Sequence, residues 1–310
     1  MNIYSMGGRS MLDGKEIKVA VIGLDTSHSV VFTELMQSPD CPAEKRVPGL
    51  RTISCLRFPT PFQSEEGLDA RQKQMEGWGV KVTTDFDEAV ADCDAIMLEI
   101  NDPAYHLDYF KRCADLGKPI FLDKPMAGNI EDGRKIYDLA KSKSLKVFST
   151  STLRFVPQLL EACIQMPEPY FTTTYGPLGV APAGSSIVWY GVHSFEMLQR
   201  AMGAGAAAVK TVEDKAGVVS VVEYADGRRG VVELTVGAGI YGGCLRSKEK
   251  AVPYVVDMSR HYPDLLLEIE KFFRTGKAPI SLGTTFEVMA MLDAAERSFK
   301  SGKTEAMGVA

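Results

Sequence analysis

In the first half of the chain, apolar and polar positions fall into blocks typical of buried strands and amphipathic helices. Residues 17–23, IKVAVIG, form an almost continuous run of apolar, mostly β-branched side chains, as expected of a parallel strand covered on both faces. A helical pattern follows over residues 27–37 and stops before the turn residues 38–40. A second strand is predicted over residues 50–56. The order strand, helix, strand is the start of a crossover unit.

The alternation continues to about residue 150. Six strands joined by helical crossovers form an open parallel sheet, so we predict an α/β fold with a Rossmann domain over residues 1–150. Residues 1–16 are expected to be a loose extension before the first strand. The later strands are predicted at 80–84, 94–100, 119–125 and 145–150, with helices near 67–78, 85–92, 105–116 and 130–142.

After residue 150 the pattern changes from crossovers to hairpins. Residues 218–225 and 230–236 alternate as strands and are separated by the turn sequence ADGRRG. Residues 284–303 carry apolar positions on one helical face, which predicts a closing amphipathic helix. We therefore predict a second domain over residues 151–310, an α+β unit with a largely antiparallel, open-faced sheet, used for substrate binding and oligomerisation.

Composition narrows the class of protein. A chain of 310 residues fits two domains, and a net charge of −5 without a Lys/Arg run makes nucleic acid an unexpected partner. The longest apolar runs are strand-sized, and the N-terminus lacks a secretory pattern, so no membrane partner is expected. Six scattered cysteines without a CxxC pair indicate reduced thiols and a cytoplasmic location. Four histidines without metal-ligand spacing favour no metal site.

The first strand ends in a loop whose setting suits a pyrophosphate. Unpaired backbone N–H groups and the helix dipole attract an anion where a strand passes through glycine into a helix. The loop Gly23-Leu24-Asp25-Thr26-Ser27-His28 keeps only the first glycine of G-x-G-x-x-G. Either the loop binds a dinucleotide, with the hydroxyls of Thr26 and Ser27 donating hydrogen bonds to it, or the loop is a plain turn in which Asp25 or Ser27 caps the helix. If it binds one, Asp25→Gly should tighten binding.

The second strand ends without the acidic residue that usually meets the adenosine ribose. Arg57 stands there instead. An arginine at this place can accommodate a 2′-phosphate, which weakly favours NADP over NAD, although a solvated surface arginine fits the pattern better.

A further strand ends in the turn Asp123-Lys124-Pro125, at the edge where ligands bind in parallel sheets. This turn resembles the Glu-Lys-Pro motif of the Gfo/Idh/MocA family of glucose-fructose oxidoreductases and inositol dehydrogenases. His106, the stretch 153–157 (LRFVP) and Gly276-Lys277 follow the family's order, whereas Asn101-Asp102-Pro103 stands where the family usually has Thr-Pro-Asn. The resemblance runs from about residue 18 to 303.

The resemblance implies a role for each of these residues. The cofactor, NAD or NADP, would contact the loop 23–28, Arg57, Asn101, His106 and the turn 123–125. Lys124 would hydrogen-bond the reacting oxygen and align it with the nicotinamide. Beyond their places in these motifs, His28 and His261 are assigned no chemistry.

The family also places an Asp four residues before a catalytic His. Here the histidine is His193, and Trp189 stands at the Asp position. His193 is suited to accept the hydroxyl proton because its ordinary pKa lies near working pH. Tyr190 would inherit part of the lost role, and Glu196 would either orient the His193 ring or face solvent. Neither Lys124 nor His193 is expected in the core.

The sequence therefore predicts an NAD(P)-dependent oxidoreductase acting on a secondary alcohol of a sugar, cyclitol or related polyol, in a homodimer or homotetramer. The alternative is a ligand-binding member of the same fold with altered or lost catalysis, since the glycine loop and the Asp position both depart from the family. A third possibility is transient use of the cofactor for elimination or epimerisation.

Overall fold

A computed structural model of the protein describes residues 14–308, so most of the predicted N-terminal extension lies outside the described part. The first layer is a six-stranded sheet in the order β3-β2-β1-β4-β5-β6, and every ladder in it is parallel. This confirms the predicted Rossmann-type sheet. Its strands are β1 (Ile17–Ile22), β2 (Leu50–Leu56), β3 (Lys81–Thr83), β4 (Ala95–Leu98), β5 (Ile120–Leu122) and β6 (Val147–Ser149).

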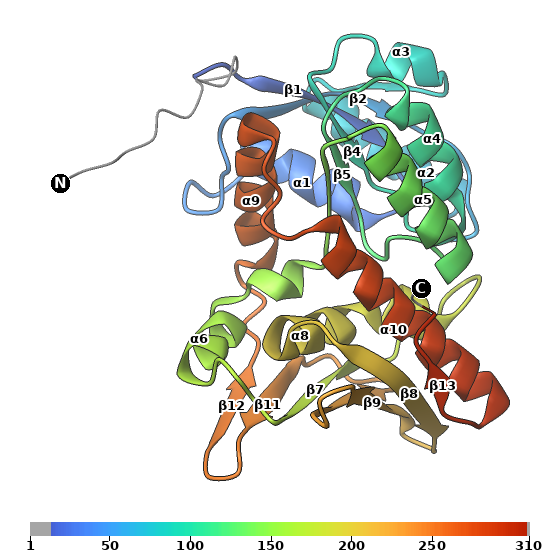
Figure 1. The fold of residues 1–310 in the computed structure, drawn as a ribbon. Helices are drawn as coiled ribbons and strands as arrows, with labels where there is room; N and C mark the ends of the chain where they lie inside the picture. The colour runs from blue at the N-terminus through green and yellow to red at the C-terminus, as the bar shows by residue number, and fades with distance from the viewer. Residues whose placement is uncertain (1–13, 309–310) are drawn as a thin grey trace.

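Helices cover both faces of this sheet, and each face has its own buried apolar cluster (Figure 1). Four of the helices begin at a polar side chain, Thr26, Ser64, Asp85 or Asn129, that accepts a hydrogen bond from a first-turn N–H. The crossover helices are α1 (Ser27–Gln37), α2 (Glu65–Gly77), α3 (Phe86–Val90), α4 (His106–Ala114), preceded by the 3₁₀ turn η1 (Pro103–Tyr105), and α5 (Ile130–Ser142).

The second sheet has seven strands in the order β12-β11-β7-β10-β9-β8-β13. Only the pair β7 and β10 is parallel; the other neighbours run antiparallel, including the predicted hairpin of β9 and β10. The strands are β7 (Phe171–Pro177), β8 (Ala206–Glu213), β9 (Gly217–Tyr224), β10 (Arg229–Thr235), β11 (Gly242–Arg246), β12 (Ala251–Val255) and β13 (Glu305–Ala306).

Helices α8 and α10 lie between the two sheets in Figure 1, and they bury one face of the second sheet. The helix α9 instead returns to the first sheet, where Leu265, Ile269 and Phe272 join the cluster that contains α1. A domain boundary near residue 150 remains a prediction. Although α9 comes after this position in the chain, it packs against the first sheet. These helices are η2 (Thr152–Phe155), α6 (Pro157–Gln165), α7 (Ser186–Trp189), α8 (Val192–Met202), α9 (His261–Thr275) and α10 (Leu282–Ser301).

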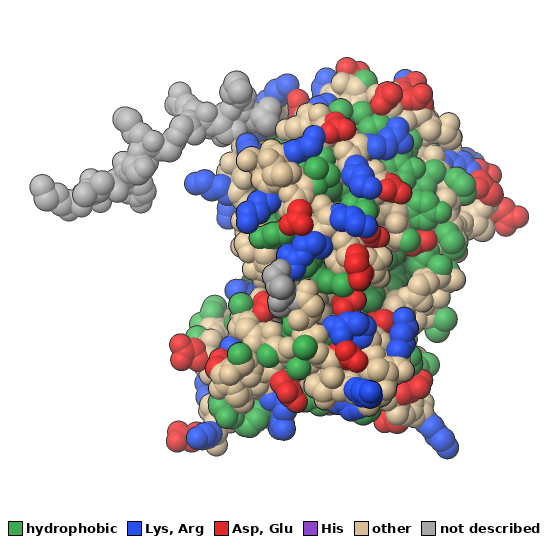
Figure 2. Space-filling model, turned by 45° about the vertical axis from the view of Figure 1, so that its right-hand side comes forward, with side chains coloured by type: hydrophobic (Ala, Val, Ile, Leu, Met, Phe, Trp, Pro, Cys, Tyr) green, Lys and Arg blue, Asp and Glu red, His purple; other side chains and the backbone are tan. Residues whose placement is uncertain are grey.

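The surface carries mixed charge. On the face shown in Figure 2, acidic and basic side chains are interspersed and neither sign covers a large area. Within residues 14–308, no helix is long and apolar enough to cross a membrane. All six cysteines are free thiols, four of them buried, as the sequence predicts.

Candidate functional site

A cleft of about 230 Å³ lies at the carboxyl edge of the parallel sheet, where the second half of the chain meets the loops after β1, β4 and β5. Edges of this kind bind ligands in open α/β folds. The cleft brings together eight residues singled out in the sequence: Asp25, Thr26, Ser27, His28, Asn101, Lys124, Tyr190 and His193.

The loop after β1 retains the first glycine of the motif and leads into the N-terminus of a helix. Gly23 has φ +110°, and a Cβ there would collide with the carbonyl oxygen of Glu99, so glycine is required at this position. Thr26 is the N-cap of α1 and accepts a hydrogen bond from the His28 N–H at 3.2 Å. The N-terminus of this eleven-residue helix therefore opens on the cleft beside Ser27, which is exposed.

Asp25 does not cap this helix, so the predicted cap at Asp25 or Ser27 is wrong. Its carboxylate turns toward the neighbouring loops and accepts hydrogen bonds from the N–H groups of Asn101 (2.9 Å) and Asp102 (3.3 Å) and from the Thr60 hydroxyl (2.7 Å). Burial raises the pKa of Asp25, and these hydrogen bonds act against that rise. The side chain thus ties the loop after β1 to the loops after β2 and β4.

We expect Asp25→Gly to lower the free energy of unfolding by about 2–4 kcal/mol, because it leaves two backbone donors and a hydroxyl without their acceptor. Urea denaturation of the two proteins measures the difference. Asp25→Asn is the matched variant: it keeps the volume and one acceptor oxygen, and we expect a smaller loss. An Asp25→Gly protein as stable as wild type would contradict this role for the carboxylate. The predicted gain in cofactor affinity remains a separate expectation.

Arg57 is engaged by acidic partners at the end of β2. Its guanidinium forms ion pairs with Glu65 and Asp69, both at 2.7 Å, and donates a further hydrogen bond to Gln72. These partners raise the pKa of Arg57. A 2′-phosphate would have to compete with two carboxylates for this arginine. Its predicted role in NADP binding remains a prediction.

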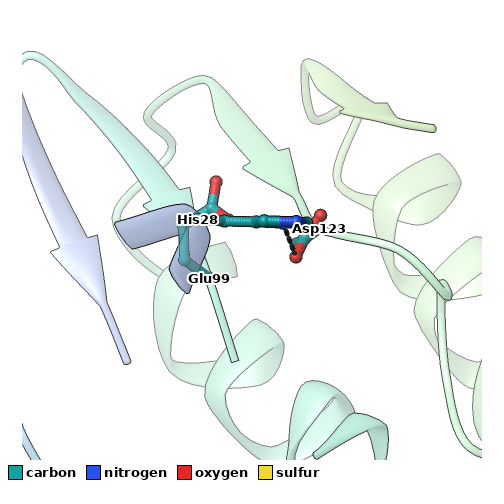
Figure 3. Close-up of side chains that lie close together, drawn as sticks. All are labelled: His28, Glu99 and Asp123. Carbon is teal, nitrogen blue, oxygen red and sulfur yellow. Dashed lines mark hydrogen bonds and ion pairs between the residues drawn. The ribbon is translucent and has the colours of Figure 1, made fainter. Parts of the chain in front are cut away.

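His28, Glu99 and Asp123 meet beneath the cleft, from α1, the end of β4 and the end of β5 (Figure 3). The Nδ1 atom of His28 lies 2.7 Å from Asp123 Oδ2 and 3.9 Å from Glu99 Oε2. All three side chains are buried. His28 therefore occupies the third glycine position of the loop and contacts the acid of the Asp-Lys-Pro turn.

The pKa values of the two carboxyl groups are shifted in opposite directions. Despite its burial, the pKa of Asp123 falls to about 2, because His28 and Lys124 stabilise its carboxylate. Burial and the neighbouring Asp123 raise the pKa of Glu99 well above its ordinary value, and no described residue donates a hydrogen bond to its oxygens. Burial thus favours the protonated form of Glu99, whereas the neighbours of Asp123 favour its carboxylate. One ligand atom from each of the three residues lies within 4.8 Å of the others, so this set could also hold a divalent cation.

Lys124 and His193 line the same cleft, and both are buried, so the expectation that neither belongs to the core is wrong. His193 Nδ1 lies 2.7 Å from the Ser151 hydroxyl, and its ring contacts Tyr190 and Tyr241 edge-on at 5.5 and 5.7 Å between centroids. Burial, together with the Lys124 cation, holds the pKa of His193 well below its ordinary value. His193 is therefore an uncharged imidazole at neutral pH, and it is a weaker base than an ordinary histidine.

Trp189, at the family's Asp position, bridges the two halves of the molecule. Its Nε1 donates to Asn101 Oδ1 at 2.9 Å, and its ring packs against Phe62 with 5.4 Å between centroids. An indole cannot accept a proton, so Trp189 cannot take over the role of an Asp. It closes the cleft over the loop that follows β4.

Besides Arg57, two more sequence-predicted residues lie away from the cleft. His106 is buried, and its ring nitrogens bond the carbonyl oxygens of Ile100 (2.8 Å) and Met126 (3.3 Å), which fixes the loops after β4 and β5. Glu196 neither orients His193 nor faces solvent: it is buried and paired with Arg154 at 2.8 Å. Both predictions for Glu196 are wrong, because α8 is buried on nearly every side. Gly23, Leu24 and Pro125 contribute backbone beside the cleft rather than its lining.

Several lining residues were not predicted from the sequence. Arg71, Tyr241, His261 and Tyr262 come from α2, the start of β11 and the start of α9. Tyr262 packs against His28 with 5.3 Å between ring centroids. No motif marks these residues, because they reach the cleft through packing of distant segments.

Comparisons with known proteins agree with this architecture. Residues 17–151 match the family model described as an oxidoreductase family with an NAD-binding Rossmann fold. An uncharacterized oxidoreductase of Escherichia coli, YhhX, is 31% identical over 77 residues, which cover 24% of this chain and 22% of that protein. The chain matches less than a quarter of the length of its curated relatives.

Solved structures match almost the whole chain. Myo-inositol dehydrogenase from Lactobacillus casei, solved with NAD(H) and myo-inositol, covers 95% of this chain and 97% of its own, with a TM-score of 0.79 and 15% identity. GenD2 of gentamicin A biosynthesis, solved with NAD, covers 99% and 100%, with a TM-score of 0.75 and 14% identity. At these identities the likeness establishes the fold alone.

Proposed function

We propose that the chain, whose residues 17–151 match the Gfo/Idh/MocA family of oxidoreductases with an NAD-binding Rossmann fold, oxidises or reduces a secondary alcohol carbon of a sugar, cyclitol or related polyol with NAD or NADP. One observation carries the proposal. Lys124 and His193, from the two halves of the chain, line one cleft together with the N-terminus of α1.

The loop after β1 fits a nicotinamide dinucleotide. Gly23 permits the tight turn between β1 and α1, α1 offers its N-terminus, and the Asp25 carboxylate is turned away and bound elsewhere. The loop 23–28, Asn101 and the turn 123–125 would hold the cofactor. When bound, the cofactor supplies the hydride acceptor or donor.

The chain's own residues would move the proton. Lys124 is placed to donate a hydrogen bond to the substrate oxygen and to stabilise the negative charge that develops there. His193, neutral and held by Ser151, is placed to take the hydroxyl proton. Tyr190 contacts the His193 ring and supplies a second hydroxyl beside the same oxygen.

The polar lining supports a substrate with several hydroxyl groups. Thr152, Tyr190, Tyr241 and His261 all face the cleft, and each can exchange hydrogen bonds with an alcohol. The myo-inositol bound in the Lactobacillus casei structure is a substrate of this kind. Trp189 supports the alternative function, a protein that binds such a ligand without oxidising it. The indole stands at the family's Asp position and cannot perform the proton transfer of a carboxylate.

We also propose that a second copy of the chain covers the outer face of the second sheet, giving a homodimer or homotetramer. Val212 on β8 and Val255 on β12 are 52% and 59% exposed. Exposed apolar strands of this kind favour association.

The proposal is tested by incubating the protein with NAD⁺ or NADP⁺ and a panel of cyclitols, aldoses and alditols, beginning with myo-inositol, and following formation of the reduced cofactor. We expect turnover with at least one polyol and a preference for one of the two cofactors. Binding of a polyol without any reduction of either cofactor would favour the ligand-binding rival.

A further inference from the structure

The loop after β1 has lost two of the three glycines that let a backbone surround a pyrophosphate. Asp25 and His28 stand at the second and third glycine positions. A diphosphate bound here would carry about two negative charges close to the buried carboxyl of Asp25. The helix N-terminus alone offers only partial positive charge, roughly half a unit. A full positive charge near the loop would change this balance.

Arg71 provides such a charge from α2. Its guanidinium reaches over the loop, and Nη1 donates to the carbonyl oxygen of Leu24 at 2.9 Å. The side chain is half-buried and lines the same cleft as Thr26 and Ser27. Its position is therefore set before any ligand arrives, by a hydrogen bond to the loop itself.

The electrostatic surroundings of Arg71 differ from those of Arg57. Arg57 is held by two carboxylates at 2.7 Å. Among residues 14–308, no carboxylate lies within ion-pair distance of Arg71, and Asp25 acts on it only from further away. A guanidinium has five N–H donors in a fork that matches phosphate oxygens, and one of them is used here.

We propose that Arg71 binds the pyrophosphate of the dinucleotide and supplies the contacts that the missing glycines no longer give. This inference rests on the proposed function, since it requires that a dinucleotide binds at the loop. The Leu24 carbonyl orients the guanidinium, Thr26 and Ser27 offer hydroxyls beside it, and the diphosphate is held between Arg71 and the α1 N-terminus.

The test compares four full-length proteins: wild type, Arg71→Gln, Arg71→Lys and the control Lys73→Gln. Lys73 is exposed on the same helix, so its variant removes one positive charge without reaching the cleft. The probes are NADH and ADP, measured by calorimetric titration at low and high salt. Circular dichroism and thermal unfolding establish that each variant is folded.

We expect Arg71→Gln to lower the affinity for both NADH and ADP by about 10- to 100-fold, as for loss of a hydrogen-bonded charge pair. Arg71→Lys should bind both probes with intermediate affinity, because it keeps the positive charge but lacks the paired N–H donors of the guanidinium. If Arg71→Gln fails to fold, Arg71→Lys provides the comparison with wild type. Lys73→Gln should match wild type. The salt dependence of ADP binding should be weaker in Arg71→Gln than in wild type.

Two results would overturn the inference while leaving the proposed function in place: wild-type affinity in Arg71→Gln, or a loss of affinity with unchanged salt dependence, which would assign Arg71 a structural role only. Absence of NADH and ADP binding by the wild-type protein would instead overturn the inference together with the proposed function.

Discussion

Lys124→Ala should lower turnover by two or more orders of magnitude on any polyol that the wild-type protein oxidises. Lys124 follows Asp123, whose charged carboxylate lies beneath the cleft, and its own side chain lines the cleft beside His193. Removing a preorganised donor of this kind typically costs about 10²–10³ in rate. The measurement is kcat with saturating cofactor.

The control for this variant is Lys111→Ala, an exposed lysine on α4 far from the cleft lining, which should retain wild-type turnover. NADH affinity should change little in Lys124→Ala, which separates a catalytic effect from loss of cofactor. Because Lys124 is buried, thermal unfolding of the variant must also be compared with wild type. Turnover within a few-fold of wild type would remove Lys124 from the proposed chemistry.

His193→Ala should lower turnover by about 10²–10⁴, the range expected for loss of a general base. The structure adds an expectation about pH. The pKa of His193 lies well below its ordinary value of 6.5, so the imidazole stays neutral at neutral pH. Oxidation requires this neutral form, so its rate should not fall until the pH drops well below 6.5, where His193 becomes protonated. A rate that already declines between pH 8 and 7, roughly, would contradict a neutral His193 as the base.

Tyr190→Phe is the matched variant for His193. It keeps the ring that packs against His193 and removes only the hydroxyl. A large loss in Tyr190→Phe with a mild effect in His193→Ala would move the acid-base role to Tyr190. Full activity in both the Lys124 and His193 variants would contradict the catalytic roles proposed for these two residues.

The sequence predicted the first sheet well because buried parallel strands and their crossover helices leave strong local patterns. The helices α1 and α5 begin and end where the periodicity predicts. The return of α9 to the first sheet left no such signal. An amphipathic helix shows that it has a buried face, but its pattern does not identify the surface against which that face packs.

The residues of the site likewise fall into those that the sequence could predict and those that it could not. Lys124 and His193 could be placed in one cleft from motif and topology. The orientation of Asp25 could not, because its partners Thr60, Asn101 and Asp102 lie 35 to 77 residues away in the chain. Glu196 was misjudged because the spacing along one helix suggested a partner in His193, whereas the buried Arg154, 42 residues earlier, pairs with it.

The central claim, that this cleft binds a nicotinamide dinucleotide, is tested most directly by titrating the protein with NADH and NADPH while following tryptophan fluorescence. The chain has two tryptophans: Trp189 lines the cleft and Trp78 packs against the apolar core. We expect a saturable change in fluorescence, with a Kd between about 1 µM and 1 mM for at least one of the two cofactors, and a smaller change in Trp189→Phe. No saturable change with either cofactor at millimolar concentration would contradict the claim.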